Sequence, residues 1–166
     1  MIKLNDKQIS EYFHRNYTAV DGLWFMKVEE QFDFETALKI DNEVWKVLPK
    51  IQARMLKSMG NLGDDIVSLR ESVETKLYLE GYEFDVEPNN DDGFKCIITE
   101  CPWHNAMVKS GRTDLSSKVG KRICLTEYNT WLTEFDTPLR FEIEIRICEG
   151  EKQCVLNFFK EESKAK

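Results

Sequence analysis

The sequence predicts an α+β fold, in which a helical N-terminal half packs with an antiparallel β-sheet and a long helix in the C-terminal half. Two observations predict this fold. Up to residue 80, apolar residues recur every three or four positions and glycine and proline are scarce, which is typical of helices. After Gly81 the apolar period changes to two in several short segments, which is typical of strands with one wet face.

Capping residues divide the first part of the helical half. Asn5 and Gln8 have the spacing of a capping pair, at the start of a helix that is expected to run from about 6 to 19. The dipeptide Asp21-Gly22 then interrupts the pattern, and a second apolar stripe follows up to about residue 32.

Two more helices are expected before the sheet. Asp33 is placed to cap one of them, and Pro49 should bend that helix or restart it as the first residue of a following segment. Gly60 and Gly63 close this stretch. A further apolar stripe predicts a helix from about 64 to 80.

The C-terminal half begins with a predicted hairpin. Residues 82–87 and 94–98 alternate between apolar and polar side chains, and the residues from Pro88 to Gly93 are those that a hairpin turn favours. A short helix up to about 109 should follow Cys101-Pro102.

A long helix and a second hairpin are expected to complete the fold. The apolar pattern from 115 places the end of the long helix near 134. Residues 139–147 alternate most clearly, a turn is expected at 149–152, and residues 153–159 should form the partner strand.

Length and charge limit the class of protein. The 166 residues, 42% of them hydrophobic, predict a single α+β domain over 1–160, with a charged, disordered tail at 161–166. The net charge of −7 argues against nucleic acid as a partner. No apolar run approaches the roughly 20 residues that a membrane helix needs, and no signal peptide is recognisable, so a cytoplasmic location is expected.

The cysteines are the main chemical feature of the sequence. Five thiols in a reducing compartment, and an odd number of them, do not suit a disulfide framework. Cys148 and Cys154 flank the last hairpin turn, which brings them close together, while Cys101 follows a strand and Cys124 lies on the long helix. These four thiols predict a metal site, with zinc as the natural occupant.

A second interpretation gives the cysteines no chemistry. Free cysteines are often small buried hydrophobes, and Cys96, Cys124 and Cys154 are open to that interpretation. Cys96 alternates with Phe94 and Ile98, so packing explains it. A redox function ranks last, because no Cys-x-x-Cys pair is present.

Two stretches of the chain resemble known families. Residues 21–45 (DGLWFMKVEEQFDFETALKIDNEVW) are similar to the N-terminal signature of the L-2-amino-thiazoline-4-carboxylic acid hydrolase-like family. The motifs Cys101-Pro102-Trp103 and Cys124-x-x-Glu127-Tyr128 and the hairpin from Cys148 to Cys154 resemble that family's cysteines and those of the 4-vinyl reductase domain family.

The resemblance implies a small-molecule-binding domain with zinc beside an apolar ligand pocket, and a homodimer. The ligand would be a small hydrophobic or heterocyclic molecule. The last two cysteines lie closer together than is usual in 4-vinyl reductase domains, in which one ligand can be a glutamate, so Glu127, Glu144 or His104 can replace one cysteine.

Six residues are candidates for contact with the ligand. Trp103 and His104 adjoin Cys101, and Glu127 follows Cys124. Trp24, Glu29 and Asp41 are family-like positions that can line a cavity, although an ordinary core role for Trp24 and Trp45 and a solvated face for Glu29 compete with that interpretation.

Two functions follow from these expectations, and they differ in the metal. The first is a zinc-containing small-molecule-binding domain, whose metal is closed by four protein ligands. The alternative is a metal-dependent hydrolase of a cyclic amidine or thiazoline-like substrate, which needs three protein ligands, a bound water and a base such as Glu127 or His104.

Overall fold

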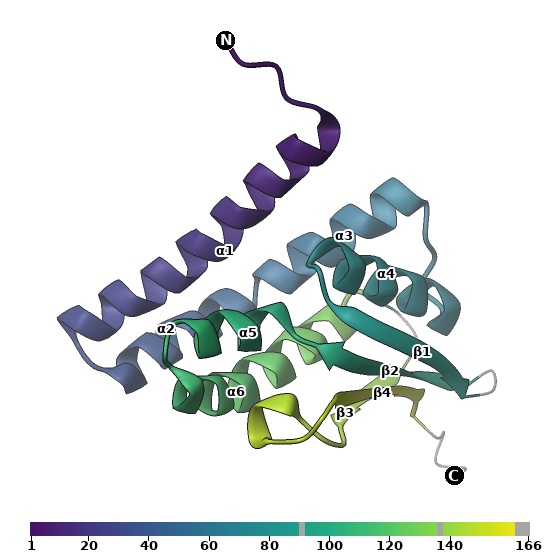
Figure 1. Ribbon diagram of the computed structural model, residues 1–166. Helices are drawn as coiled ribbons and strands as arrows, with labels where there is room; N and C mark the ends of the chain where they lie inside the picture. The colour runs from purple at the N-terminus through teal and green to yellow at the C-terminus, as the bar shows by residue number, and fades with distance from the viewer. Residues whose placement is uncertain (90–91, 136–137, 162–166) are drawn as a thin grey trace. The chain divides into compact units, whose positions relative to one another are not determined.

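The computed structural model describes residues 1–89, 92–135 and 138–161, and it confirms the predicted α+β class. In chain order, helices precede the first strand, and further helices come between the second and the third strand (Figure 1). The elements in chain order are α1 (Asp6–Gln31), α2 (Phe34–Trp45), α3 (Leu48–Gly60), α4 (Ile66–Leu79), β1 (Glu83–Asn89), β2 (Gly93–Glu100), α5 (Pro102–Lys109), α6 (Thr113–Leu132), β3 (Leu139–Ile143), the 3₁₀ turn η1 (Ile147–Glu149) and β4 (Cys154–Lys160).

The chain forms two compact units, residues 1–43 and residues 44–166. The N-terminal unit contains α1 and most of α2. The C-terminal unit contains the other helices and the whole sheet. The single domain expected over 1–160 stays a prediction, and the tail from 162 onward lies outside the described residues.

Helix α1 is longer than predicted. The capping pair is confirmed, because the Gln8 N–H donates to Asn5 Oδ1 at 2.9 Å and the Asn5 N–H donates to Gln8 Oε1 at 3.0 Å. The interruption predicted at Asp21-Gly22 is wrong, since one unbroken helix runs through it (Figure 1). A glycine inside a helix costs only about 1 kcal/mol, which the helix on both sides outweighs.

A two-residue connection joins α1 to α2. The Thr36 N–H donates to Asp33 Oδ1 at 2.7 Å, which confirms Asp33 as the cap of the next helix. The rings of Phe25 and Phe34 lie 5.8 Å apart across the turn. Apolar burial in this unit is small and is confined to three side chains near the turn: Val28, Ala37 and Leu38.

Proline and aspartate set the starts of the next two helices. Pro49 lies in the first turn of α3, so it restarts the helix as expected. The helix ends where Asn61 adopts a left-handed conformation at φ 50°. Asp65 caps α4 by accepting from the Ser68 N–H at 2.7 Å, which confirms the predicted fourth helix.

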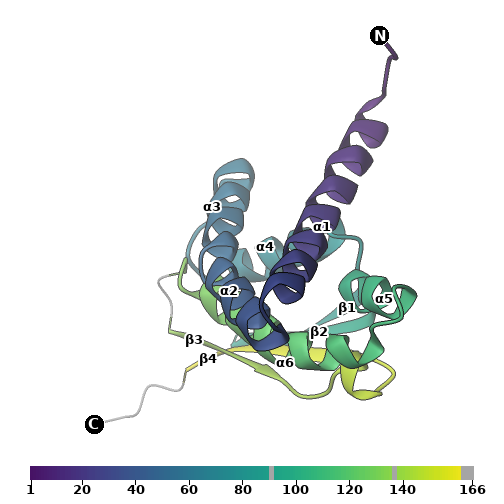
Figure 2. The same cartoon turned by 90° about the vertical axis from the view of Figure 1, so that its left-hand side faces the viewer.

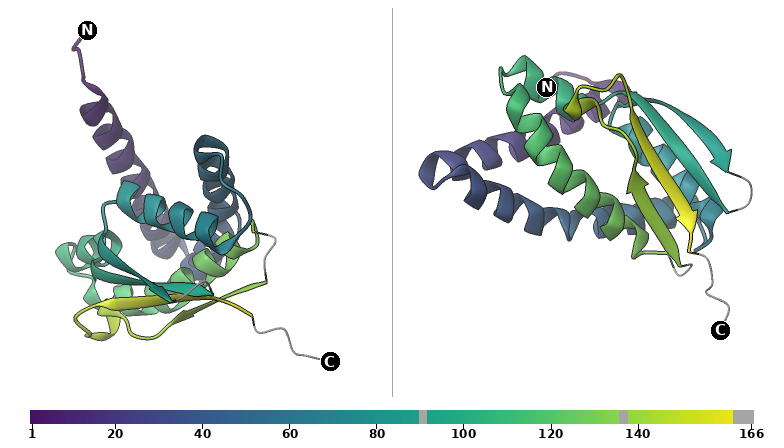
Figure 3. Two further views of the ribbon diagram at one scale, coloured as in Figure 1. Left: turned by 90° about the vertical axis from the view of Figure 1, so that its right-hand side faces the viewer. Right: turned by 90° about the horizontal axis from the view of Figure 1, so that it is seen from below.

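The four strands form one antiparallel sheet in the order β1-β2-β4-β3. One row of paired residues crosses it from Val86 through Cys96 and Leu156 to Ile143. Side chains of β2 that share a face are fully buried under the helices, and Figure 3 shows α4 and α6 covering that face. The turn predicted at 88–93 includes residues 90 and 91, which lie outside the described part of the chain.

The strand expected over 139–147 is wrong in length, because β3 ends at Ile143. Pairing persists a little further, since the Glu144 N–H donates to the Val155 carbonyl and the Val155 N–H donates to the Ile145 carbonyl. The backbone then curls into η1. There the Ile147 N–H donates to Cys154 Sγ, so it no longer pairs with a neighbouring strand.

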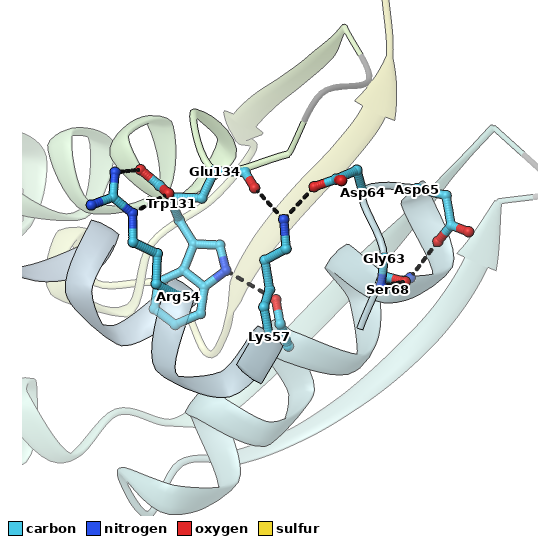
Figure 4. Close-up of polar contacts among 9 residues, drawn as sticks. Arg54, Lys57, Gly63, Asp64, Asp65, Ser68, Trp131 and Glu134 are labelled. Atoms are coloured by element: carbon cyan, nitrogen blue, oxygen red, sulfur yellow. Dashed lines mark hydrogen bonds and ion pairs between the residues drawn. The ribbon is translucent and has the colours of Figure 1, made fainter. Parts of the chain in front are cut away.

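Polar contacts tie α3 and α4 to the end of α6 (Figure 4). The Trp131 indole N–H donates to Ser72 Oγ at 3.0 Å inside the core. Arg54 donates two hydrogen bonds to the Glu134 carboxylate, at 2.6 and 2.9 Å. Lys57 pairs with Asp64 and donates to the Glu134 carbonyl at 2.7 Å. These contacts fix the helix layer that holds α6 over the sheet.

Over residues 1–89, 92–135 and 138–161, no helix combines the length and the apolar character that crossing a bilayer requires.

Candidate functional site

Three of the four predicted ligand cysteines lie where the chain changes direction. Cys101 caps α5, and its Sγ accepts from the His104 N–H at 3.5 Å. Cys154 opens β4, and its Sγ accepts from the Ile147 N–H at 3.2 Å. Backbone N–H groups that point at sulfur stabilise a thiolate, so both thiols lie in settings that suit a metal ligand.

The third cysteine, Cys148, lies in η1 against a glycine of α6. A Cβ added to Gly120 would lie only 3.0 Å from Cys148 Sγ, so the missing side chain of Gly120 makes room for the thiol. Helices α5 and α6 lie side by side, joined by a short loop (Figures 1 and 2). The end of β2, both helices and the last hairpin therefore meet at one end of the sheet.

Cys124 joins this group from α6. Burial raises its pKa well above the ordinary value, and negative charge on Glu127, Cys101, Cys148 and Cys154 raises it further. Those four groups are therefore near enough for their charges to act on the Cys124 thiol.

The other cysteine pKa values agree with this gathering. Burial raises the pKa of Cys154 to about 11, against the hydrogen bond from Ile147, and the charges of Cys101 and Cys148 raise it too. Burial is also the largest cause of the raised pKa of Cys101 and of Cys148. Without a metal ion, all four thiols therefore stay protonated at neutral pH.

A ready-made metal site is not formed by these side chains as they stand. Within the described parts of the chain, no three His, Cys, Asp or Glu side chains are arranged to hold a metal ion. The donor set nevertheless suits zinc, which takes four sulfur ligands at about 2.3 Å in a tetrahedron.

The fifth cysteine has a different environment. Cys96 is fully buried between Phe94 and Ile98 on β2, as expected for a packing residue. Burial raises its pKa to about 12.

A buried ion network, which the sequence interpretation missed, lies beside the cysteines. Lys76 Nζ lies 2.7 Å from Glu127 Oε1 and 2.9 Å from Glu80 Oε2, and all three side chains are less than a tenth exposed. Burial disfavours the Lys76 charge, but the two carboxylates outweigh that effect and hold its pKa well above the ordinary value. A signal was present, because Lys76 and Glu80 follow Leu69 and Val73 on the buried stripe of α4.

Two tyrosines complete the surroundings of Lys76. The ring centroids of Tyr82 and Tyr128 lie 5.6 and 5.4 Å from its Nζ. The Tyr82 side chain also hydrogen-bonds Cys101. The cation, its two carboxylates and the cysteine group therefore form one polar centre inside an apolar core.

Three of the predicted ligand-binding residues lie at or next to this centre. Trp103 packs edge-on against the buried Trp45, with ring centroids 6.0 Å apart. The His104 ring meets Ser116, with Nδ1 2.8 Å from Oγ. Glu127 is buried and paired with Lys76. Glu144, an alternative metal ligand, is exposed and pairs with Lys95 at 2.7 Å.

The other three, Trp24, Glu29 and Asp41, belong to the N-terminal unit. Trp24 is 68% exposed, so the core role considered for it is wrong, whereas the core role of Trp45 is confirmed by its 3% exposure. Of the apolar stripe that carries Trp24, it is Val28, four residues further along α1, that is buried. Glu29 and Asp41 are half-buried.

The fold and the cysteine group define a class: an α+β domain with a thiol-rich centre at one end of an antiparallel sheet. The chain belongs to a family of unknown function, DUF6125, whose sequence model matches residues 3–159. No curated protein matches the sequence.

A solved structure shares the fold. It is subunit 3 of a trafficking protein particle complex from Naegleria fowleri, in a crystal structure covalently bound to palmitic acid. The match has a TM-score of 0.57 and covers 97% of this chain and 100% of that one, at 12% sequence identity. At this identity the likeness concerns the fold.

Proposed function

We propose that this protein is a zinc-containing small-molecule-binding domain, in which Cys101, Cys124, Cys148 and Cys154 hold one zinc ion. The observation that carries the proposal is the gathering of thiols from separate elements. Cys148 Sγ lies against Gly120 of α6, the neighbouring Ile147 donates to Cys154 Sγ, and the charges of Cys101, Cys148 and Cys154 act on Cys124. Two of these thiols already accept backbone hydrogen bonds.

Zinc would supply both order and stability at this end of the sheet. It replaces the four thiol protons, so the free energy of binding adds to that of folding. A shell of four thiolates has no open position for an activated water, which favours a structural metal over the hydrolase alternative.

The proposed ligand is a small molecule that is mainly apolar. Trp103 and His104 follow Cys101 after Pro102, so a ligand beside the metal would meet an aromatic edge and a polar ring. The trafficking-complex subunit was solved covalently bound to palmitic acid, and that apolar group on a protein of similar fold supports an apolar ligand here. We include a homodimer in the proposal, as the family resemblance of the sequence implies.

Elemental analysis of the purified protein tests the metal. We expect one zinc per chain, X-ray absorption with four sulfur neighbours near 2.3 Å, and loss of zinc in Cys101→Ser and Cys148→Ser. Cys96→Ala is the matched control, because it removes a thiol outside the group. Zinc that persists equally in all three variants would refute the ligand assignment, and an oxygen in the first shell would favour the hydrolase.

Native mass spectrometry with palmitic acid as the probe tests the ligand. We expect one fatty acid per chain and weaker binding in Trp103→Ala than in a Trp24→Ala control. Equal binding by the two variants would place the ligand elsewhere. If palmitic acid does not bind at any concentration below its solubility limit, the apolar ligand class is wrong.

A further inference from the structure

Helix α1 carries a second apolar face that burial does not explain. Its buried residue, Val28, and the Phe25 ring that meets Phe34 lie on one side of the helix. The neighbouring side presents six large apolar side chains that are 40–68% exposed, with Trp24 at the edge next to Val28: Ile9, Tyr12, Phe13, Val20, Leu23 and Trp24. We call this set the α1 seam.

The seam has the spacing of a helix that packs on another helix. Ile9, Phe13, Asn16, Val20 and Leu23 follow one another at intervals of four, three, four and three residues. This alternation keeps one narrow stripe facing a partner helix. Asn16 is exposed at its middle, where a single polar residue can set the register of a helix pair.

The seam is also complementary to itself. Ile9 lies seven residues before Asn16 and Leu23 seven after it, while Phe13 and Val20 lie three before and four after. A twofold axis through Asn16 would therefore set Ile9 of one antiparallel helix against Leu23 of the other. A patch of this kind can pair with the same patch on a second copy in a twofold-symmetric dimer, which is the commonest oligomer.

The charged residues of α1 favour a second copy of this chain over a membrane surface as the partner of the seam. The exposed ion pair of Glu11 with Arg15 lies on the side of α1 away from the seam, so pairing two seams buries neither charge. A membrane-surface helix is typically rich in basic residues on its polar face, whereas this face is mixed and the chain carries a net charge of −7.

The apolar area is adequate for a specific contact. A fully buried aromatic side chain covers about 150–250 Å², so three aromatic and three aliphatic side chains exposed to this extent present on the order of 600 Å². A standard interface needs about 800 Å² per partner, and residues flanking the seam would supply the remainder.

We infer that two copies of this chain associate through antiparallel contact of their α1 seams, centred on Asn16. The inference rests on the proposed homodimer and names the surface that forms it.

Sedimentation equilibrium of the zinc-loaded full-length protein, in the wild type and in Phe13→Glu and Val20→Glu, tests the inference. We expect a dimer in the wild type and a dissociation constant at least 100-fold higher in either variant. Met59→Glu is the matched control, because Met59 is an equally exposed apolar residue on α3. Helical circular dichroism and zinc content should stay unchanged in all three variants.

A cross-linking experiment tests the same contact without placing a glutamate in the seam. In Asn16→Cys the two new thiols face each other across the axis, so a short bis-maleimide should link two copies, whereas Arg15→Cys should link them far less. A dimer that survives both glutamate variants, with no cross-link in Asn16→Cys, would overturn the seam and leave the homodimer intact. A monomeric wild type would overturn both.

Discussion

Lys76 Nζ lies 2.7 Å from Glu127 Oε1 although the two side chains are only 2% and 6% exposed. Such a pair gains little net stability over an apolar one, but removing one partner leaves the other charge buried alone. Because Glu80 also meets Lys76, the lysine compensates two carboxylates next to the cysteine group.

Replacing this lysine should strongly destabilise the protein. We expect Lys76→Met to lower the free energy of unfolding by about 3–5 kcal/mol, measured by urea denaturation, because two buried carboxylates lose their cation. Lys27→Met, which breaks an exposed pair with Glu30, should cost less than about 1 kcal/mol. Adding Glu127→Gln to Lys76→Met should recover part of the loss, and full additivity of the two changes would show that they do not interact.

The hydroxyl group of Ser72 should contribute measurably to the stability of the protein. Ser72→Ala leaves the buried Trp131 indole N–H without its acceptor, so we expect a loss of about 1–3 kcal/mol in the free energy of unfolding. Ser58→Ala, at an exposed position of α3, is the control and should change stability by less than about 0.5 kcal/mol. Equal effects of the two substitutions would mean that the indole finds another acceptor.

Substitution by alanine should weaken zinc binding at Gly120 but stabilise the fold at Gly22. Gly120→Ala places a Cβ 3.0 Å from Cys148 Sγ, so we expect zinc affinity to fall on the order of tenfold, measured by competition with a chromogenic chelator. Gly22→Ala meets nothing within 4 Å, so it should raise the free energy of unfolding by about 0.5–1 kcal/mol through helix propensity. Unchanged zinc affinity in Gly120→Ala would separate Cys148 from the metal site.

Without metal, the protein should lose stability as the pH rises above about 9. The unfolded chain releases its thiol protons near the ordinary pKa of 9.0, whereas the folded thiols of Cys124, Cys148 and Cys154 keep theirs to higher pH. The folded state then binds more protons, so the free energy of unfolding falls with rising pH. Lys76 adds to this loss of stability above pH 10.5, the ordinary pKa of lysine. Above that pH the unfolded chain releases the Lys76 proton, whereas the folded protein keeps it until the pH passes the raised pKa.

Urea denaturation between pH 7 and pH 10, with reductant and chelator, measures this loss. In zinc-loaded protein the ligand thiols have already given up their protons, so their part of the loss should disappear. Stability that rises from pH 8.5 to pH 10 in the metal-free protein would contradict the raised thiol pKa values.

Local signals in the sequence predicted most of the elements. Asn5, Asp33 and Pro49 act through contacts within a few residues, so their roles could be predicted without any fold. Gly22 misled because a local preference of about 1 kcal/mol competes with a helix of 26 residues. The strand at 139–147 was overextended for a related reason, since alternation does not reveal where a strand curls away.

The amino-acid sequence by itself determined the helical half and the antiparallel hairpins, because periodicity and turn chemistry act over short distances. Only the tertiary structure decided that Lys76 is buried between Glu80 and Glu127, that Gly120 makes room for Cys148, and that Trp24 is exposed. Such facts depend on contacts between residues far apart in the chain, and a pattern of residue types says which face of a helix is apolar but not what covers it.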